Sequence, residues 1–173
     1  IPGDQAPLEY IDTAGCGFDE QASGTSYVNP EEAAFLTSML FDYLENLRHQ
    51  GTGDVSVGVI SPYKRQVELL KEKVSGHPLY KNWADNISVN TIDAFQGQER
   101  DIIFIGMVRS NPEGITGFLS EIRRMNVAMT RAKKKLVIIG DSATLSRQGF
   151  YDDFISFTQE NNAYRSAWEF INF

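Results

Sequence analysis

Five apolar runs, each about the length of a strand, alternate along this chain with segments of helical periodicity. The runs at residues 55–60 and 135–140 are rich in β-branched side chains, and the second is almost continuously apolar. Such runs are typical of strands buried on both faces of a parallel sheet, because a strand with one solvated face alternates apolar and polar residues. The five predicted strands are residues 8–12, 55–60, 87–92, 102–108 and 136–139. The pattern predicts an α/β fold with a mainly parallel central sheet and helices on both faces.

Capping residues mark where the first two helices begin. Asn29 is a favourable N-cap, Pro30 fits the first helical position, and Glu32 stands at the third, after which leucines recur on one face. Ser61 and Pro62 repeat this start for a second helix that extends to residue 74. Together with the strand at 55–60, this helix completes a βα unit.

A third helix is expected to begin with Ser120 as its cap. Its apolar face is predicted to consist of Ile122, Met125, Met129 and Ala132. Aromatic residues at positions 150, 154 and 157 predict a last helix that packs onto the sheet. Polar and glycine-containing segments at 15–25 and 111–117 are predicted to be loops.

The composition excludes several classes of protein. A hydrophobic content of 42% can build a core, so the chain is not intrinsically disordered. There is no apolar stretch long enough to cross a membrane, and one cysteine with two histidines cannot supply a zinc site or an internal disulfide. We expect a soluble, metal-free domain from a reducing compartment, cytoplasmic or nuclear, and the missing initiator methionine suggests a piece of a longer protein.

Charge is distributed unevenly along the chain, although the formal net charge is −7. Residues 1–54 contain ten acidic side chains and one basic, whereas residues 122–140 contain six basic side chains and no acidic one. A local cationic site is therefore expected on a chain that is acidic as a whole.

The phosphate-binding loop G-x-x-x-x-G-K-S/T is absent, and so are the G-x-G-x-x-G and G-x-S-x-G motifs and any plausible Cys–His pair. The chain does contain Arg124, Ala128 and Arg131 at helical spacing, which predicts two guanidinium groups on one helix face with a small residue between them. Such a pair suits a polyphosphate or a carboxylate. The alternative is a solvated face whose arginines pair with the acidic first third of the chain.

Residues 91–99 form a second candidate site, because amide and carboxylate side chains there surround Gly97 after a predicted strand. An ordinary polar connection with Asp93 as a turn residue remains the alternative.

Three segments together resemble motifs IV, V and VI of superfamily 1 helicases, in the same order and at similar spacing. They are residues 59–66 (VISPYKRQ), 89–101 (VNTIDAFQGQERD) and 123–133 (RRMNVAMTRAK). Residues 23–29, 108–111 and 117–119 narrow the resemblance to the branch with the nonsense-mediated-decay helicase, senataxin and certain nuclease-helicases. It covers roughly residues 8–145.

The resemblance implies that residues 1–173 are the second RecA-like domain of such a motor, a three-layer sandwich. The family's first domain carries the phosphate loop and the magnesium-binding motif, so ATP with Mg²⁺ would be bound mainly by a domain that this chain lacks. The arginine finger falls on Arg131, with Arg124 beside it, and the motif V glutamate falls on Glu99, next to Gln96 and Gly97.

The resemblance also implies contacts to single-stranded DNA or RNA. Thr91, with Ser61, Pro62 and Tyr63, corresponds to backbone contacts, and Arg109, Ser110 and Asn111 lie where this branch often touches the strand. Contacts to phosphate and sugar position a strand without reading its sequence, so little sequence preference is expected.

Two features depart from the family. The chain begins after the position of the Gln-Tyr-Arg-Met-His-Pro signature, so weak nucleotide binding is expected, and motif V has Gln98 where many relatives have arginine after the glycine. The expected function is the C-terminal motor domain of an ATP-dependent helicase or translocase, inactive as an isolated fragment, with the first RecA-like domain as its partner. The alternatives are a non-catalytic nucleic-acid or protein-binding module and the helicase part of a nuclease-helicase.

Overall fold

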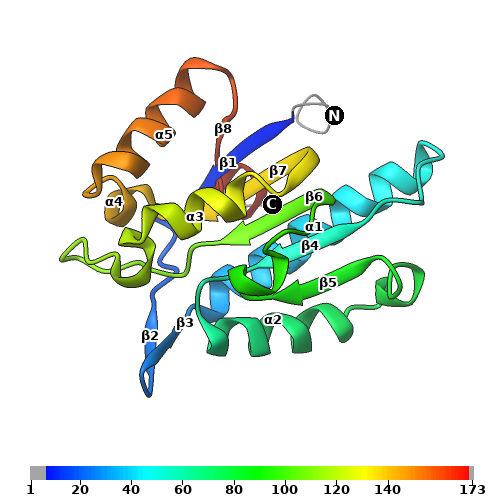
Figure 1. The fold of residues 1–173 in the computed structure, drawn as a ribbon, viewed down its shortest axis with the longest axis horizontal. Helices are drawn as coiled ribbons and strands as arrows, with labels where there is room; N and C mark the ends of the chain where they lie inside the picture. Colours follow the sequence, from blue (N-terminus) through cyan, green and yellow to red (C-terminus); the bar gives the residue numbers. More distant parts are fainter. Residues whose placement is uncertain (1–6, 172–173) are drawn as a thin grey trace.

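A six-stranded, entirely parallel sheet forms the centre of the computed structural model, which describes residues 7–171 (Figure 1). The strand order is β5-β4-β6-β7-β1-β8. The strands are β1 (Leu8–Asp12), β4 (Val57–Ile60), β5 (Ile87–Asn90), β6 (Arg100–Gly106), β7 (Ala132–Gly140) and β8 (Tyr164–Ser166). The five predicted strands are all present, which confirms the α/β prediction.

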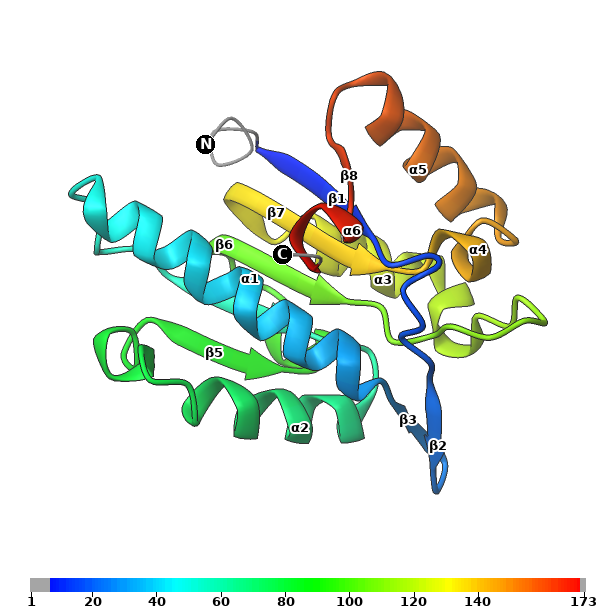
Figure 2. The same ribbon diagram turned by 180° about the vertical axis from the view of Figure 1, so that it is seen from behind.

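Helices cover both faces of this sheet. The α-helices are α1 (Pro30–His49), α2 (Lys64–Ser75), α3 (Ile122–Met129), α4 (Ser142–Leu145), α5 (Gly149–Glu160) and α6 (Trp168–Ile171). Short 3₁₀ helices are η2 (Tyr80–Asn82), η3 (Ile92–Phe95) and η4 (Gly117–Ser120). Figure 2 shows α1 and α6 in front of the sheet, and Figure 1 shows α3 in front of its other face.

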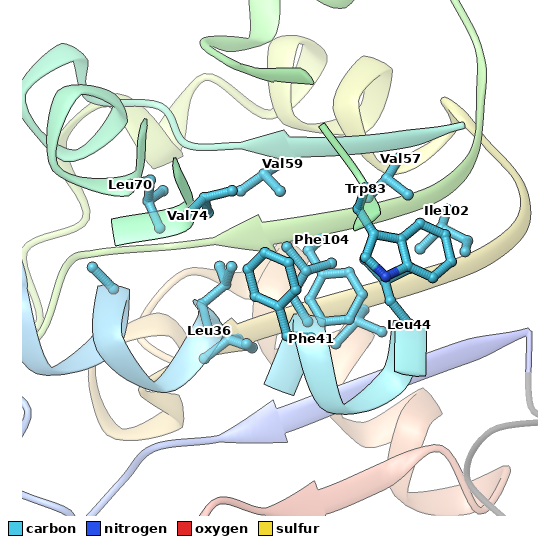
Figure 3. Close-up of a cluster of buried hydrophobic side chains, with 14 of the residues drawn as sticks. Leu36, Phe41, Leu44, Val57, Val59, Leu70, Val74, Trp83, Ile102 and Phe104 are labelled. Atoms are coloured by element: carbon cyan, nitrogen blue, oxygen red, sulfur yellow. The ribbon is translucent and has the colours of Figure 1, made fainter. Parts of the chain in front are cut away.

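Two separate cores result from the alternation of side chains along the buried strands. On β6, Ile102 and Phe104 point to the face covered by α1 and α2, whereas Ile103 and Ile105 point to the face covered by α3 and α5. Figure 3 shows the first core, where Phe41 and Leu44 of α1 meet the strands. Because both faces are buried along the centre of the sheet, β4 and the buried parts of β6 and β7 are apolar on both sides, as the sequence indicates.

The structure corrects the predicted starts of two helices. The predicted helix start at Ser61 and Pro62 is wrong, because Tyr63 is extended, is 2% exposed and immediately precedes α2, which no side chain caps. Ser120 does not cap α3 either, because Glu121 is at the N-cap position and the Ser120 hydroxyl donates to the Gly117 carbonyl.

The end of α3 also differs from the prediction. The helix stops at Met129, and Ala132 is the first residue of β7, so Ala132 does not belong to the helix face. Parallel pairing of β7 with β6 begins at Ala132 opposite Arg100, and this pairing ends the helical pattern of the sequence.

Three strands were not predicted. Residues 15–25 are not wholly a loop, because β2 (Gln21–Ser23) and β3 (Ser26–Val28) form an antiparallel hairpin that turns at Gly24, where φ is +64°. Strand β8 has three residues and forms by pairing with β1.

Gly58 of β4 is needed for the packing of the second core. A Cβ at this position would lie 2.7 Å from Cδ1 of Ile103 and 2.9 Å from Cε1 of Phe95. We therefore expect Gly58→Ala to lower the free energy of unfolding by about 1–3 kcal/mol, the usual cost of overpacking, in urea titrations followed by tryptophan fluorescence.

The matched control is Gly53→Ala, because a Cβ at Gly53 would meet no atom within 4 Å. This variant should stay within about 0.5 kcal/mol of the wild type. Equal stability of the two variants would show that the Gly58 site can relax without cost.

Candidate functional site

The parallel sheet sorts the predicted site residues into two groups. Residues that follow β4, β5 and β6 lie at the carboxyl edge of the sheet, where ligands of open α/β sheets bind. These are Ser61, Pro62, Tyr63, Thr91, Arg109, Ser110 and Asn111. Residues that directly precede β6 and β7 lie at the opposite, amino edge, and these are Gln96, Gly97, Glu99 and Arg131. The structure does not bring the two groups together.

A cavity of about 330 Å³ opens at the carboxyl edge, and we call it the carboxyl-edge cavity. Its lining comes from the β2–β3 hairpin, the turn after β4, the end of β5, η3, η4 and α3. The lining residues are Thr25, Ser26, Pro62, Tyr63, Lys64, Thr91, Asp93, Phe118 and Arg124. Three of the predicted strand-binding residues therefore share one cavity with an arginine and a lysine.

The rings of Tyr63 and Phe118 line one wall of this cavity, and the ring of Tyr27 packs behind them. We call these three residues the aromatic cluster. Tyr63 stacks on Phe118 with the ring centroids 5.3 Å apart and the planes at 29°. Tyr27 of β3 meets Tyr63 edge-on at 5.5 Å. Tyr63 is buried, whereas 47% of Phe118 is exposed.

Arg109 supports the aromatic cluster from inside the protein. Its side chain is 4% exposed, and its Nε donates to Oε1 of Glu20 at 2.9 Å. Its Nη1 donates to the Tyr63 hydroxyl at 3.0 Å, and the guanidinium carbon lies 4.0 Å from the Tyr27 ring centroid. Burial alone would lower the pKa of Arg109, but the hydrogen bonds to Glu20 and Tyr63 outweigh burial and raise it.

Ser110 and Asn111 are also hydrogen-bonded within the chain. The Ser110 hydroxyl donates to Asp141 at 2.7 Å, and the Ser110 N–H donates to Glu20. The Asn111 side-chain amide donates to Glu20 and to the Ile115 carbonyl, and its oxygen accepts the Ile115 N–H. Glu20 therefore ties this segment to the loop before β2.

Asn29 joins four segments beside the cavity. Its side-chain oxygen caps α1 by accepting the Glu32 N–H, which confirms the predicted cap. Its side-chain nitrogen donates to the carbonyls of Phe18 and Val108, at 2.8 and 3.0 Å. Its backbone N–H and carbonyl both bond to the side chain of Gln66 in α2.

Glu32 makes an unusual contact with the turn after β6. Val108 has φ of +69°, a strained conformation for a β-branched residue. Both oxygens of the buried Glu32 carboxyl accept the Val108 N–H, at 3.1 and 2.9 Å. Burial is the main cause that raises the pKa of Glu32 to about 8, against the opposing hydrogen bond from Val108. The hydrogen bonds between Glu32 and Val108 fix the backbone that leads into Arg109.

The two arginines of the predicted helix face lie in different surroundings. Arg124 is in the first turn of α3, lines the carboxyl-edge cavity and pairs with Asp93 at 3.1 Å. Arg131 lies beyond the end of α3, so the prediction that both groups project from one helix face is wrong. Ala128 leaves no space for a ligand either, because it is fully buried in the second core.

Arg131 lies next to an exposed loop and makes few side-chain hydrogen bonds within the part of the chain that the structure describes. Within residues 7–171, the one side-chain hydrogen bond of Arg131 runs from Nε to the Val127 carbonyl. The Arg131 carbonyl accepts the N–H of Arg100, which places the arginine beside the exposed residues Gln96, Gly97 and Glu99 that precede β6. A guanidinium beside an open glycine loop fits part of a polyphosphate site.

The described part of the chain has no group of three or more side chains that could hold a metal ion. No helix among residues 7–171 is both long and apolar enough to span a bilayer.

Sequence reasoning did not assign a role to Glu20, Tyr27 or Phe118, and it assigned Glu32 only to the start of α1, whereas its carboxyl accepts the Val108 N–H. Tyr27 and Phe118 lie in segments that carry the family resemblance, which was the available signal. There was no sequence signal for the partners of Glu20 and Glu32, because these partners lie 76 or more residues away.

Removing Glu20 should leave the Arg109 guanidinium buried without its counter-ion. We expect Glu20→Ala to lower the free energy of unfolding by about 3 kcal/mol, as is usual for a broken buried pair. Urea unfolding measures this. The control is Glu68→Ala, which breaks the exposed Arg65–Glu68 pair and should change stability by about 1 kcal/mol or less. Similar small losses in both variants would contradict the structural role of Glu20.

The raised pKa of Glu32 predicts a pH dependence of stability. Folded chains keep a proton on Glu32 that unfolded chains release, so the free energy of unfolding should fall as pH rises from 4.5 to about 8. Glu32→Gln removes this titration and can still accept the Val108 N–H, so its stability should vary less across that range. Urea titrations at several pH values test this. The exposed neighbour variant, Glu31→Gln, should keep the wild-type slope, and equal slopes for wild type and Glu32→Gln would refute the prediction.

Comparison with known proteins places this geometry in a family. A family model described as an AAA domain, AAA_12, matches residues 1–143. The chain is 34% identical to the DNA-binding protein SMUBP-2 of Mus musculus, over 97% of this chain and 16% of that protein. It is 39% identical to the DNA polymerase alpha-associated DNA helicase A of Saccharomyces cerevisiae, over 83% of this chain and 20% of the helicase.

A third relative is the regulator of nonsense transcripts 1 homolog of Drosophila melanogaster, which is 32% identical over 92% of this chain and 13% of its own length. The chain therefore spans 13–20% of the lengths of these three relatives. With the matching fold, these similarities confirm the resemblance found in the motifs. The chain belongs to the AAA_12 family, the C-terminal RecA-like domains of superfamily 1 helicases, in the branch represented by SMUBP-2 and the regulator of nonsense transcripts 1.

Proposed function

We propose that this domain is half of the motor of an ATP-dependent helicase or translocase, supplying an arginine finger at one edge of its sheet and part of a single-strand path at the other. The observation that carries the proposal is this separation. The partly exposed Arg131 and the exposed loop of residues 96–99 lie at the amino edge, and a cavity lined by aromatic, hydroxyl and cationic groups lies at the carboxyl edge.

Arg131 is suited to the role of arginine finger. Its position between α3 and β7 is fixed by backbone hydrogen bonds to Ala128 and Arg100, while no acidic side chain among residues 7–171 pairs with it. A guanidinium held in this way can approach a γ-phosphate and stabilise the charge that develops in the transition state. Arg124 is assigned to the strand path in this proposal, because it lines the cavity with Thr91.

The loop from Gln96 to Glu99 would contact the nucleotide beside Arg131. Gly97 has φ of +74°, and a Cβ there would meet no atom within 4 Å, so its backbone is open to a ligand. ATP would be held mainly by the other RecA-like domain, since this chain has no phosphate loop. When bound, ATP supplies a phosphoryl group for transfer to water, with magnesium held by the other domain.

The strand path is proposed along the carboxyl-edge cavity. Pro62, Tyr63 and Thr91 line it, as the resemblance to motifs IV and V implies. Helix α2 begins at its rim without a side-chain cap or an acidic residue in its first turn, which favours an approaching phosphate. Ser61 is fully buried and its backbone N–H donates to the Asn90 carbonyl, so it would support the wall from inside without touching the strand. Arg109, Ser110 and Asn111 would shape the wall through their bonds to Glu20.

Closure of the two domains would couple these edges. Arg131 contributes to hydrolysis only when the other domain brings the nucleotide to the amino edge, and the same rigid domain holds the strand at the carboxyl edge. Each closure would then change the contacts that the two domains make with the strand.

Replacing the finger tests the proposal. In the full-length parent protein, Arg131→Ala should lower the steady-state ATPase turnover about 10³-fold or more, since transition-state charge would lose its partner. The measurement compares turnover with and without single-stranded DNA and RNA. Binding of the strand should be retained, because Arg131 is not at the cavity.

The matched control is Arg48→Ala, which removes an exposed arginine on α1, across the sheet from α3. This variant should keep wild-type turnover. Full turnover in Arg131→Ala would exclude the finger. A parent protein that binds single strands but never hydrolyses ATP would instead support a non-catalytic binding module.

A further inference from the structure

Phe118 is an aromatic residue whose position burial does not explain. It lies in η4 at the carboxyl-edge cavity with 47% of its surface exposed, while the next residue, Leu119, is fully buried and makes the core contact of this short helix. An exposed ring beside polar and cationic groups has the features of a stacking surface. We propose that Phe118 stacks against a nucleobase of the single strand, an inference that rests on the proposed function.

The ring is held in place before any ligand arrives. Its inner face stacks on Tyr63 at 5.3 Å, and its backbone N–H donates to the Tyr63 hydroxyl at 3.3 Å. The same hydroxyl accepts from Arg109, which is itself paired with Glu20. A chain of contacts therefore fixes the ring, so little conformational entropy is given up when a base stacks on it.

The other wall of the cavity offers groups that suit a nucleotide. Thr25, Ser26 and Thr91 provide hydroxyls, and Lys64 provides positive charge for a phosphate, while Arg124 is paired with Asp93 in the same lining. The volume of about 330 Å³ falls in the range of small-ligand sites. Because the ring offers only its π face, the contact would accept any base, in agreement with weak sequence preference.

The test uses the full-length parent protein and fluorescence anisotropy with labelled oligothymidylate and oligouridylate. Phe118→Ala should weaken binding about 5- to 150-fold, the range expected for one stacked base. Phe118→Tyr should keep wild-type affinity, since it retains a flat ring. Phe118→Leu keeps an apolar side chain without a π face and should bind as weakly as Phe118→Ala.

An abasic oligonucleotide of the same length separates stacking from phosphate contacts. Without bases, wild type and Phe118→Ala should bind equally. The control is Phe157→Ala on α5, which removes a similarly exposed ring, 51% accessible and outside the cavity lining, and should not change binding.

The outcomes distinguish the two proposals. The stacking proposal would be overturned if Phe118→Ala or Phe118→Leu bound single strands as tightly as the wild type does. Either result would leave the proposed function intact. A parent protein that binds no single strand would overturn both. Thermal unfolding of each variant establishes that it is folded under the conditions of the assay.

Discussion

The hydrogen bonds of Asn29 determine how the segments around the carboxyl-edge cavity meet. Its side chain caps α1 and donates to the carbonyls of Phe18 and Val108. Its backbone N–H and carbonyl form two hydrogen bonds with the side-chain amide of Gln66 in α2. Every polar group of this buried residue has a hydrogen-bond partner, so burying the junction leaves no polar group of Asn29 unsatisfied. The hairpin, both helices of the first layer and the turn into Arg109 share this fixed point, and the aromatic cluster is built on it.

Helix α3 spans the distance between the two edges of the sheet. Its first turn carries Arg124 at the cavity, and Arg131 follows its last residue at the start of β7. Met125 and Ala128 anchor the helix in the second core between them. Because packed cores deform little, the two edges of this domain are expected to move as one body.

Features with local causes were predictable from the sequence, and features with distant causes were not. The cap at Asn29 and the strands of the sheet follow from neighbouring residues and from burial on both faces. Strand β8 exists only because β1 pairs with it, and the end of α3 is set by strand pairing at Ala132. Arg109 was expected near the single strand, and its pairing with Glu20 could not be predicted because the two residues are 89 positions apart. The motifs supplied candidate site residues but did not indicate which of them are buried.

Strand β1 lies between β7 and β8, with Leu8 opposite Leu136 and Tyr10 opposite Tyr164. A segment near the start of this sequence is thus inserted between two of the last strands to be synthesised. On the ribosome, β4, β5 and β6 can pair early, whereas β1 has to wait until residue 166 has emerged before both its edges are satisfied. Until then Tyr10 and Ile11 lack some of their final neighbours, so the β1 region is among the last parts of the sheet to be completed.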